Sequence, residues 1–297
     1  MKKLLYILLI ALLFVLTSCT DVLYQKDTPI KDTDNHSRII EKNKKVLFDN
    51  AHSQTAGNAD WTITGEYSDF ADDLIKEGFE VSQHGDDESG KNQIDDDEKI
   101  SYEKLKNYYI YIIPEPNIPF TKQEKQDMIK YVKNGGNLFL ISDHEGADRN
   151  NDGWDAVEIF NGYKKYSPIH NSSTIAEEEF VGHLGFRMNF DNLYQEPITN
   201  IKSHEITKNI SQIAVWNGCS YRILDEDIEE LAYTDSTSEP YLITGKHGMG
   251  HFVSIGDTSV FNDGTYSDGT TGKYRGYHEL DHKQLAMNII NYLYNAK

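Results

Sequence analysis

Cysteine is nearly absent from this sequence. Only Cys19 and Cys219 occur among its 297 residues. The first belongs to an N-terminal segment that we expect to be processed, which leaves Cys219 without a partner. An intramolecular disulfide framework is therefore excluded, and stability has to come from a hydrophobic core. A chain of this length can bury one large α/β core or two smaller ones.

Positive charge is scarce as well. The chain carries 29 Lys and Arg residues against 48 Asp and Glu residues, which gives a formal net charge of −19 at pH 7. Such an acidic surface repels the phosphates of nucleic acids and of anionic lipid headgroups. We therefore expect no nucleic-acid partner. The same charge is compatible with divalent cations, although most of it serves to solubilise the surface.

Residues 1–19 have the pattern of an export signal. Lys2 and Lys3 precede an uninterrupted apolar run from Leu4 to Leu16, and small residues then lead to Cys19. The run is too short to span a bilayer as a stable helix and is typical of a secretory signal. Its end resembles a bacterial lipobox, in which Cys19 is acylated and becomes the mature N-terminus. This predicts an extracytoplasmic protein, lipid-anchored in the bacterial cell envelope; an ordinary secreted protein is the alternative.

A polar segment and then one domain are expected after this signal. Residues 20–43 show neither helical nor strand periodicity and predict a tether. Strands and helices alternate from there to the end of the chain, so residues 44–297 are predicted to form one α/β domain with a doubly wound, mostly parallel sheet. The predicted strands are 45–50, 79–81, 108–113, 137–141, 241–244 and 250–255, and the predicted helices are 67–77, 121–134 and 285–294. Residues 155–235 are less regular.

Several blocks of the sequence together resemble a known family. They are VLFDNAH, PFTKQEKQDMIKYVKNGGNLFLISD, HEITKNI and GMGHFVSIGDTSVFND. This set is similar to the class I glutamine-amidotransferase-like domains of uncharacterised bacterial envelope lipoproteins, ThuA-type proteins, gliding-type transport auxiliaries and intraflagellar transport proteins. The resemblance covers roughly residues 45–295. It implies a three-layer, flavodoxin- or amidotransferase-like fold and says little about activity.

The nucleophile of the true amidotransferases is missing. In that family a cysteine follows the strand that corresponds to 138–141, whereas this chain has Ser142, Asp143 and His144 there. Amidotransferase activity is therefore not expected. Cys219 lies in the irregular middle of the sequence and is predicted to be a small buried residue.

Polar side chains follow three of the predicted strands. They are Asp49 and His52 after the first strand, Asp143 and His144 after the fourth, and Asp257 after the last. Because ligands bind beyond the carboxyl ends of parallel strands, we expect the three carboxylates in one cleft, within about 10 Å of each other. These five residues are the candidates for a metal-assisted hydrolase. The alternative is that they form turns and helix caps.

Other residues of the same loops are predicted to line a ligand crevice. They are Asn50, Asn58, Asp60, Trp61, Trp154 and Asp263. An aromatic ring beside carboxylates and amides is typical of a sugar site, where the ring stacks and the polar groups give direction. The alternative is that both tryptophans pack beneath their loops.

One of these loops resembles the first half of a calcium loop. Asp148, Asn150 and Asp152 have the spacing of the first three ligands, and a glycine follows. The twelfth position, which should be glutamate, is Ile159. Asp155 could supply a further oxygen, so Asp148, Asn150, Asp152 and Asp155 are the candidate calcium ligands, and a polar turn without metal is the alternative.

Three functions stay open on this basis. The preferred hypothesis is a non-catalytic, lipid-anchored protein whose crevice holds a small polar or glycan ligand or calcium. The second is the metal-assisted hydrolase, and the third is a structural component of an envelope assembly.

Overall fold

The computed structural model describes residues 40–85, 92–272 and 274–296. The predicted signal 1–19, its Cys19 and nearly all of the predicted tether 20–43 therefore lie outside the described residues. No helix within the described ranges is long and apolar enough to cross a membrane.

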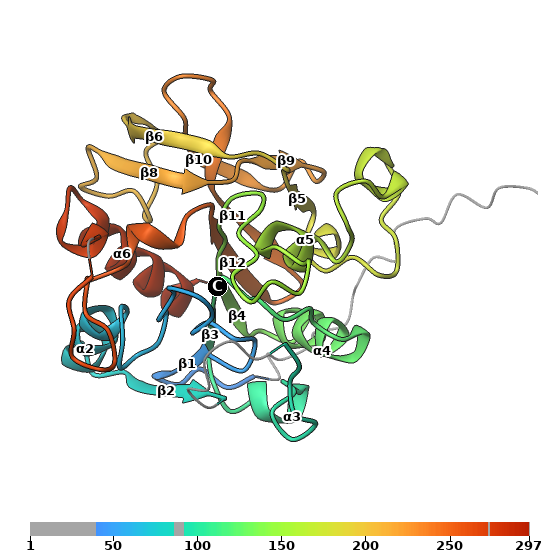
Figure 1. Cartoon of the computed structure of the whole chain (residues 1–297), viewed down its shortest axis with the longest axis horizontal. Coiled ribbons are helices and arrows are strands. Elements are labelled where there is room, and N and C mark those ends of the chain that lie inside the picture. The colour runs from blue at the N-terminus through green and yellow to red at the C-terminus, as the bar shows by residue number, and fades with distance from the viewer. Residues whose placement is uncertain (1–39, 86–91, 273, 297) are drawn as a thin grey trace, which may run out of the picture. The chain divides into compact units, whose positions relative to one another are not determined.

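An eight-stranded sheet forms the centre of the fold (Figure 1). Its strands in spatial order are β2 (Glu80–His84), β1 (Lys45–Asp49), β3 (Ile110–Pro114), β4 (Asn137–Ile141), β12 (Gly250–Ile255), β11 (Pro240–His247), β10 (Glu229–Tyr233) and β7 (Asn200–Ile201). The strands from β2 to β12 are parallel, and β11, β10 and β7 continue the sheet antiparallel. The predicted α/β class with a mostly parallel sheet is confirmed.

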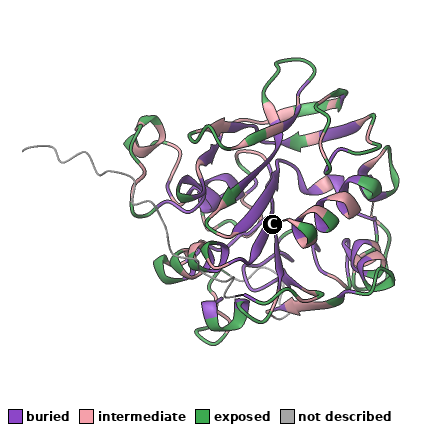
Figure 2. Cartoon of the chain, turned by 180° about the vertical axis from the view of Figure 1, so that it is seen from behind, coloured by how far each residue is buried: buried purple, intermediate pink, exposed green. Residues whose placement is uncertain are grey.

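Helices cover both faces of this sheet, which gives three layers (Figure 1). One face carries α2 (Ser68–Lys76) and α6 (His282–Asn295), and the other carries α3 (Tyr102–Leu105), α4 (Lys122–Lys133) and α5 (Ala156–Asn161). Strands covered on two sides have to be apolar along their whole length. Accordingly every residue of β3, β4 and β12 is buried, as Figure 2 shows for the central strands.

Local sequence signals explain the helix ends. α4 begins with the capping box expected from the sequence: the side chain of Thr121 accepts a hydrogen bond from the backbone of Glu124, whose own carboxylate accepts one from the backbone of Thr121. α2 has no such residue at its start. Its N-terminus is capped from a distant segment, because Asp263 accepts hydrogen bonds from Ser68 Oγ and from the backbone N–H of Asp69, both at 2.8 Å.

The middle of the chain contains short elements that the sequence did not reveal. They are the 3₁₀ helices η1 (Pro168–Asn171) and η2 (Val181–Leu184) and two small antiparallel sheets, β5 (Phe186–Met188) with β9 (Tyr221–Ile223) and β6 (Leu193–Ile198) with β8 (Ile213–Gly218). Two further 3₁₀ helices, η3 (Thr258–Val260) and η4 (Gly276–His278), follow β12. Most residues of β6 are exposed or half-buried, so the segment has no apolar pattern to predict.

A buried ion pair organises this middle region. The guanidinium of Arg187 is fully buried and donates to both carboxylate oxygens of Glu179, at 2.7 and 2.8 Å. It also donates to the carbonyl oxygens of Ser172, at 2.6 Å, and of Thr174, at 3.2 Å. One side chain thus satisfies backbone acceptors of an irregular segment that no sheet or helix pairs.

A second buried network lies at the carboxyl end of β1. His52 is fully buried between Asp49, 2.8 Å from its Nδ1, and Glu124, 3.2 Å from its Nε2. Burial opposes the charge on the ring, but the two carboxylates raise the pKa of His52 to about 10. Burial likewise opposes ionisation of Glu124, yet His52 lowers its pKa to about 2. An imidazolium between two carboxylates therefore joins β1 to α4.

This network predicts a definite pH dependence of stability. The pKa of His52 is raised above its ordinary 6.5, so its contribution is complete below pH 6.5 and is lost as the pH rises toward 10. Replacing His52 by Gln leaves two buried carboxylates without a cation, and we expect a loss of about 3–5 kcal/mol in the free energy of unfolding near pH 6. Urea unfolding from pH 6 to pH 10 should show this difference shrinking.

The matched control is His183→Gln, which changes an exposed histidine. It should leave the free energy of unfolding unchanged across the same range. A difference between His52→Gln and the unsubstituted chain that is constant with pH would contradict the charged assignment.

Candidate functional site

A crevice of about 480 Å³ opens where the loops after β1, β4 and β12 meet the β6–β8 sheet. The loops lie at the carboxyl ends of parallel strands, which is where the topology of such a sheet places ligands. The lining residues are Asn58, Trp61, Glu66, Asp143, His144, Arg149, Tyr194, Gln195, Trp216, Asn217, Ser259, Asn262, Tyr266 and Tyr274.

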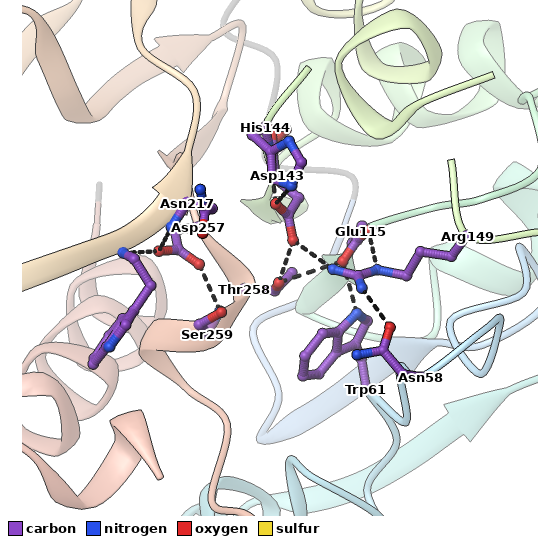
Figure 3. Close-up of polar contacts among 12 residues, drawn as sticks. Asn58, Trp61, Glu115, Asp143, His144, Arg149, Asn217, Asp257, Thr258 and Ser259 are labelled. Atoms are coloured by element: carbon purple, nitrogen blue, oxygen red, sulfur yellow. Dashed lines mark hydrogen bonds and ion pairs between the residues drawn. The ribbon is translucent and has the colours of Figure 1, made fainter. Parts of the chain in front are cut away.

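The guanidinium of Arg149 is the hub of this crevice (Figure 3). Its Nε donates to Glu115 at 2.5 Å, its Nη1 to Asn58 at 2.9 Å and its Nη2 to Asp143 at 2.9 Å. Trp61 donates its indole N–H to the second oxygen of Glu115, at 2.8 Å. The loops after β1, β3 and β4 are therefore held together through one side chain.

Burial dominates the electrostatics of the carboxylates around Arg149. Glu115 is fully buried, and burial raises its pKa to about 8 although the charge of Arg149 opposes the shift. The nearby charge of Asp143 raises it further. Thr258 donates to both groups, at 2.9 Å to Asp143 and at 3.3 Å to Glu115. These two acids are thus packed together, and Arg149 compensates for their charge.

Asp257 is close enough to Asp143 to interact electrostatically, but its own oxygens serve the backbone (Figure 3). It accepts from the N–H groups of Trp216, at 2.6 Å, and Asn217, at 3.3 Å, and caps η3 through Ser259, at 2.8 Å. Burial, followed by the charge of Asp143, raises the pKa of Asp257 to about 7. Asp257 therefore fastens the β8 wall to the end of β12.

The five predicted hydrolase residues are divided between two polar networks. Asp143 and His144 line the crevice, and Asp257 lies directly behind it. Asp49 and His52 do not line it, because their side chains are fully buried in the network with Glu124 described above. Nδ1 of His144 is hydrogen-bonded to the backbone carbonyl oxygen of Glu145, at 2.6 Å.

The predicted ligand-crevice residues also divide. Asn58 and Trp61 line the crevice. Asp60 and Asp263 are buried and are not among the lining residues; Asp60 accepts from the backbone of Ser267 at 2.7 Å. Asn50 and Trp154 are not among the lining residues. The ring of Trp154 instead makes a cation–π contact with the ammonium of Lys164, which lies 3.6 Å from the ring centre.

In the predicted calcium loop, backbone N–H groups of the loop donate to the side chains of the predicted ligands. Asp148 accepts from the N–H groups of Asp152, at 3.1 Å, and Gly153, at 2.9 Å, and Asn150 Oδ1 also accepts from Asp152, at 3.3 Å. Asp155 caps α5 instead. Within the described ranges, no group of three or more His, Cys, Asp or Glu residues is arranged to hold a metal ion. Calcium binding by this loop stays a prediction.

Sequence reasoning missed most of the crevice, because only Asn58, Trp61, Asp143 and His144 among its lining residues were predicted as site residues. Glu115 directly follows the end of β3, so the rule that selected Asp143 would have found it. Arg149 was inside the proposed calcium loop but had no role there. Tyr194 and Trp216 lie in the β6–β8 sheet, which no periodicity in the sequence announced.

Neither cysteine chemistry nor serine chemistry is set up at the crevice. Cys219 is fully buried, and burial raises the pKa of its thiol well above the usual value. Ser142, at the position of the amidotransferase nucleophile, is also fully buried and donates to the carbonyl oxygen of Asp143 at 3.3 Å.

Comparison with known proteins shows a shared fold. No family model matches the sequence, and no curated protein matches it. The N-terminal domain of mmIFT52 is similar in structure, with a TM-score of 0.58 and 14% identity over 85% of this chain and 98% of that domain. STM3548, a cytoplasmic protein from Salmonella typhimurium, has a TM-score of 0.52 and 12% identity over 84% and 99% of the two chains. A ThuA-like protein from Parabacteroides merdae has a TM-score of 0.49 and 14% identity over 85% and 90%.

Arg149 should be indispensable for the stability of this region. Arg149→Met leaves Glu115 and Asp143 without their counter-charge, and we expect a loss of about 3–5 kcal/mol in the free energy of unfolding. Arg149→Lys should recover only part of this, because a single ammonium cannot span three acceptors as the guanidinium fork does. Urea unfolding at pH 7 measures both.

The double variant Arg149→Met, Glu115→Gln serves as the control. It removes one of the two buried acids that have lost their cation and should be more stable than Arg149→Met alone. If the double variant were less stable than the single one, Arg149 would not be acting as the counter-charge.

Proposed function

We propose that this chain is a lipid-anchored protein of the bacterial cell envelope whose crevice binds a small polar ligand, a glycan fragment, without reacting with it. The observation that carries the binding proposal is a set of aromatic rings around a polar lining. They come from separate parts of the chain and are Trp61, Tyr194, Trp216, Tyr266 and Tyr274. Amides and carboxylates lie between them. Flat rings with directional polar groups suit a sugar ring.

Two of these rings are unusually exposed. Tyr194 is 80% exposed and Tyr274 is 45% exposed. An exposed tyrosine on a crevice wall contributes nothing to the core, but it can bury its face against a ligand at a low entropic cost, since it has only two rotatable bonds. The side chain of Tyr194 is therefore available to a ligand without rearrangement of the fold.

The charge of the lining argues against an anionic ligand. Arg149 is the only lysine or arginine among the described lining residues, and three of its five side-chain N–H groups already bind Glu115, Asn58 and Asp143. A phosphate or carboxylate would have to enter beside Asp143 and Glu66, where the one cation of the described lining is already paired with two acids. The geometry thus favours ligands without negative charge.

Binding is better supported than metal-assisted hydrolysis. The hydrolase hypothesis needs Asp49 and His52 beside Asp143, whereas their side chains are committed to Glu124 and to each other. The oxygens of Asp257 are likewise committed to backbone donors. Three of the five candidate hydrolase residues, Asp49, His52 and Asp257, are thus used for positioning, which fits recognition rather than bond cleavage.

The lipid anchor is supported by the N-terminal pattern of charge, apolar run and small residues before Cys19. Acylation requires the thiolate of that cysteine as nucleophile. We expect Cys19→Ser in the full chain to abolish lipid labelling and to release the protein from the membrane fraction or retain it as precursor. Unchanged labelling and fractionation would contradict the anchor.

Tyr194 provides the test of the binding proposal. A panel of immobilised oligosaccharides without negative charge, neutral and amine-bearing, would identify a sugar that the chain retains, and calorimetry would give its dissociation constant. Tyr194→Ala removes one stacking face worth about 0.5–1.5 kcal/mol, so affinity should fall about two- to tenfold. Tyr166→Ala is the matched control, because Tyr166 is 91% exposed and does not line the crevice. No retention of any sugar, or equal effects of the two variants, would contradict the proposal.

A further inference from the structure

One acid of the crevice differs from all the others in its surroundings. Glu66 lines the crevice and is 2% exposed. Its backbone is fixed on both sides: its N–H donates to the carbonyl of Asp60 and its carbonyl accepts from Asp263, both at 2.8 Å. Oε1 of its side chain accepts from Asn262 at 2.7 Å. The other oxygen, Oε2, is buried and has no hydrogen-bond partner among the described residues.

The two neighbouring acids have hydrogen-bond donors for both carboxylate oxygens, which Glu66 lacks. Asp263 accepts from Ser68, Asp69 and Thr265. Asp60 accepts from Ser267 and Thr62. A buried acceptor without a donor costs stability, and a bound group that donates to it removes that cost. The orphaned oxygen of Glu66 therefore marks a place for a donor group of the ligand.

The local charge specifies what that donor should be. Burial raises the pKa of Glu66 to about 7, and the charges of Asp60 and Asp263 raise it further, against the hydrogen bonds from Asn262 and the backbone. A cation at this position would reverse the shift, because an opposite charge favours the ionised carboxylate. A neutral hydroxyl would supply no positive charge to offset the three acids.

The aromatic residues of the lining also favour a positively charged ligand group. Tyr266 also lines the crevice, and burial, followed by the charge of Glu66, raises the pKa of its phenol. Ring faces attract ammonium groups, most strongly where water is excluded. A carboxylate oxygen without a partner beside aromatic rings is thus a receptor for a positively charged nitrogen.

We propose that Glu66 forms the subsite for an ammonium group and that the ligand of the crevice is an amino sugar with a free amine. The inference rests on the proposed glycan-binding function and specifies the class of its ligand. The sugar rings stack on the exposed tyrosines of the wall, and the ammonium donates to Glu66 Oε2.

Three trisaccharides that differ in one substituent test this inference. They are the β-1,4-linked trimers of glucosamine, N-acetylglucosamine and glucose, which carry an ammonium, an acetamide or a hydroxyl at the same ring position. Calorimetry with the full chain at pH 7 measures each dissociation constant. We expect the glucosamine trimer to bind at least about tenfold more tightly than the glucose trimer, as for a hydrogen bond to a charged partner.

Glu66→Gln separates charge from shape. Glutamine keeps an acceptor for Asn262 but removes the charge, so the preference for the glucosamine trimer over the glucose trimer should disappear. The melting temperature should stay equal or rise, because a strained acid is removed. Glu239→Gln, at an exposed position outside the crevice lining, is the matched control and should keep the full preference.

The outcomes separate this inference from the function on which it rests. Equal affinity for the three trimers, with Tyr194→Ala still weakening them, would overturn the ammonium subsite and leave glycan binding standing. A glucosamine preference that survives Glu66→Gln would also overturn the subsite. No binding of any trimer or panel sugar would overturn both.

Discussion

The crevice depends on one guanidinium. Arg149 lies among three acceptors from three different loops, and two of them belong to acids that would otherwise repel each other in a dry environment. The position of Trp61 follows from the same interaction, because its indole binds the carboxylate that Arg149 holds. The positions of Glu115, Asp143 and Trp61 thus all depend on Arg149.

Buried acids of this protein are repeatedly paired with a cationic side chain. Each of the main buried cations lies against carboxylates: His52 against Asp49 and Glu124, Arg149 against Glu115 and Asp143, Arg187 against Glu179. Asp257 and Asp263 achieve the same end with backbone donors. Buried charge is tolerated only with such partners, so an acid that lacks one is informative.

The sequence predicted the parts of the fold that follow from periodicity. The parallel strands are apolar along their length and are bounded by glycines, prolines and caps, so β1, β3, β4, α4 and the order of the layers could be read directly. The β6–β8 sheet could not, since β6 contains Pro197 and mostly exposed or half-buried residues and is held by pairing with β8, beyond β7 and a segment without regular structure. The candidate site divides in the same way: Asp143 follows from strand topology, whereas the pairing of Arg149 with Glu115 requires three dimensions.

The isolation of Cys219 has a practical meaning for the folded chain. With its sulfur enclosed and its ionisation suppressed, the thiol is sheltered from oxidants and from thiols of other molecules, so copies of the domain do not crosslink through it. A soluble form without Cys19 would then carry a single sulfhydryl that reagents reach only when the structure opens. The rate at which a reagent alkylates Cys219 would therefore report how often the fold opens locally. Cys219 is a built-in probe of local unfolding.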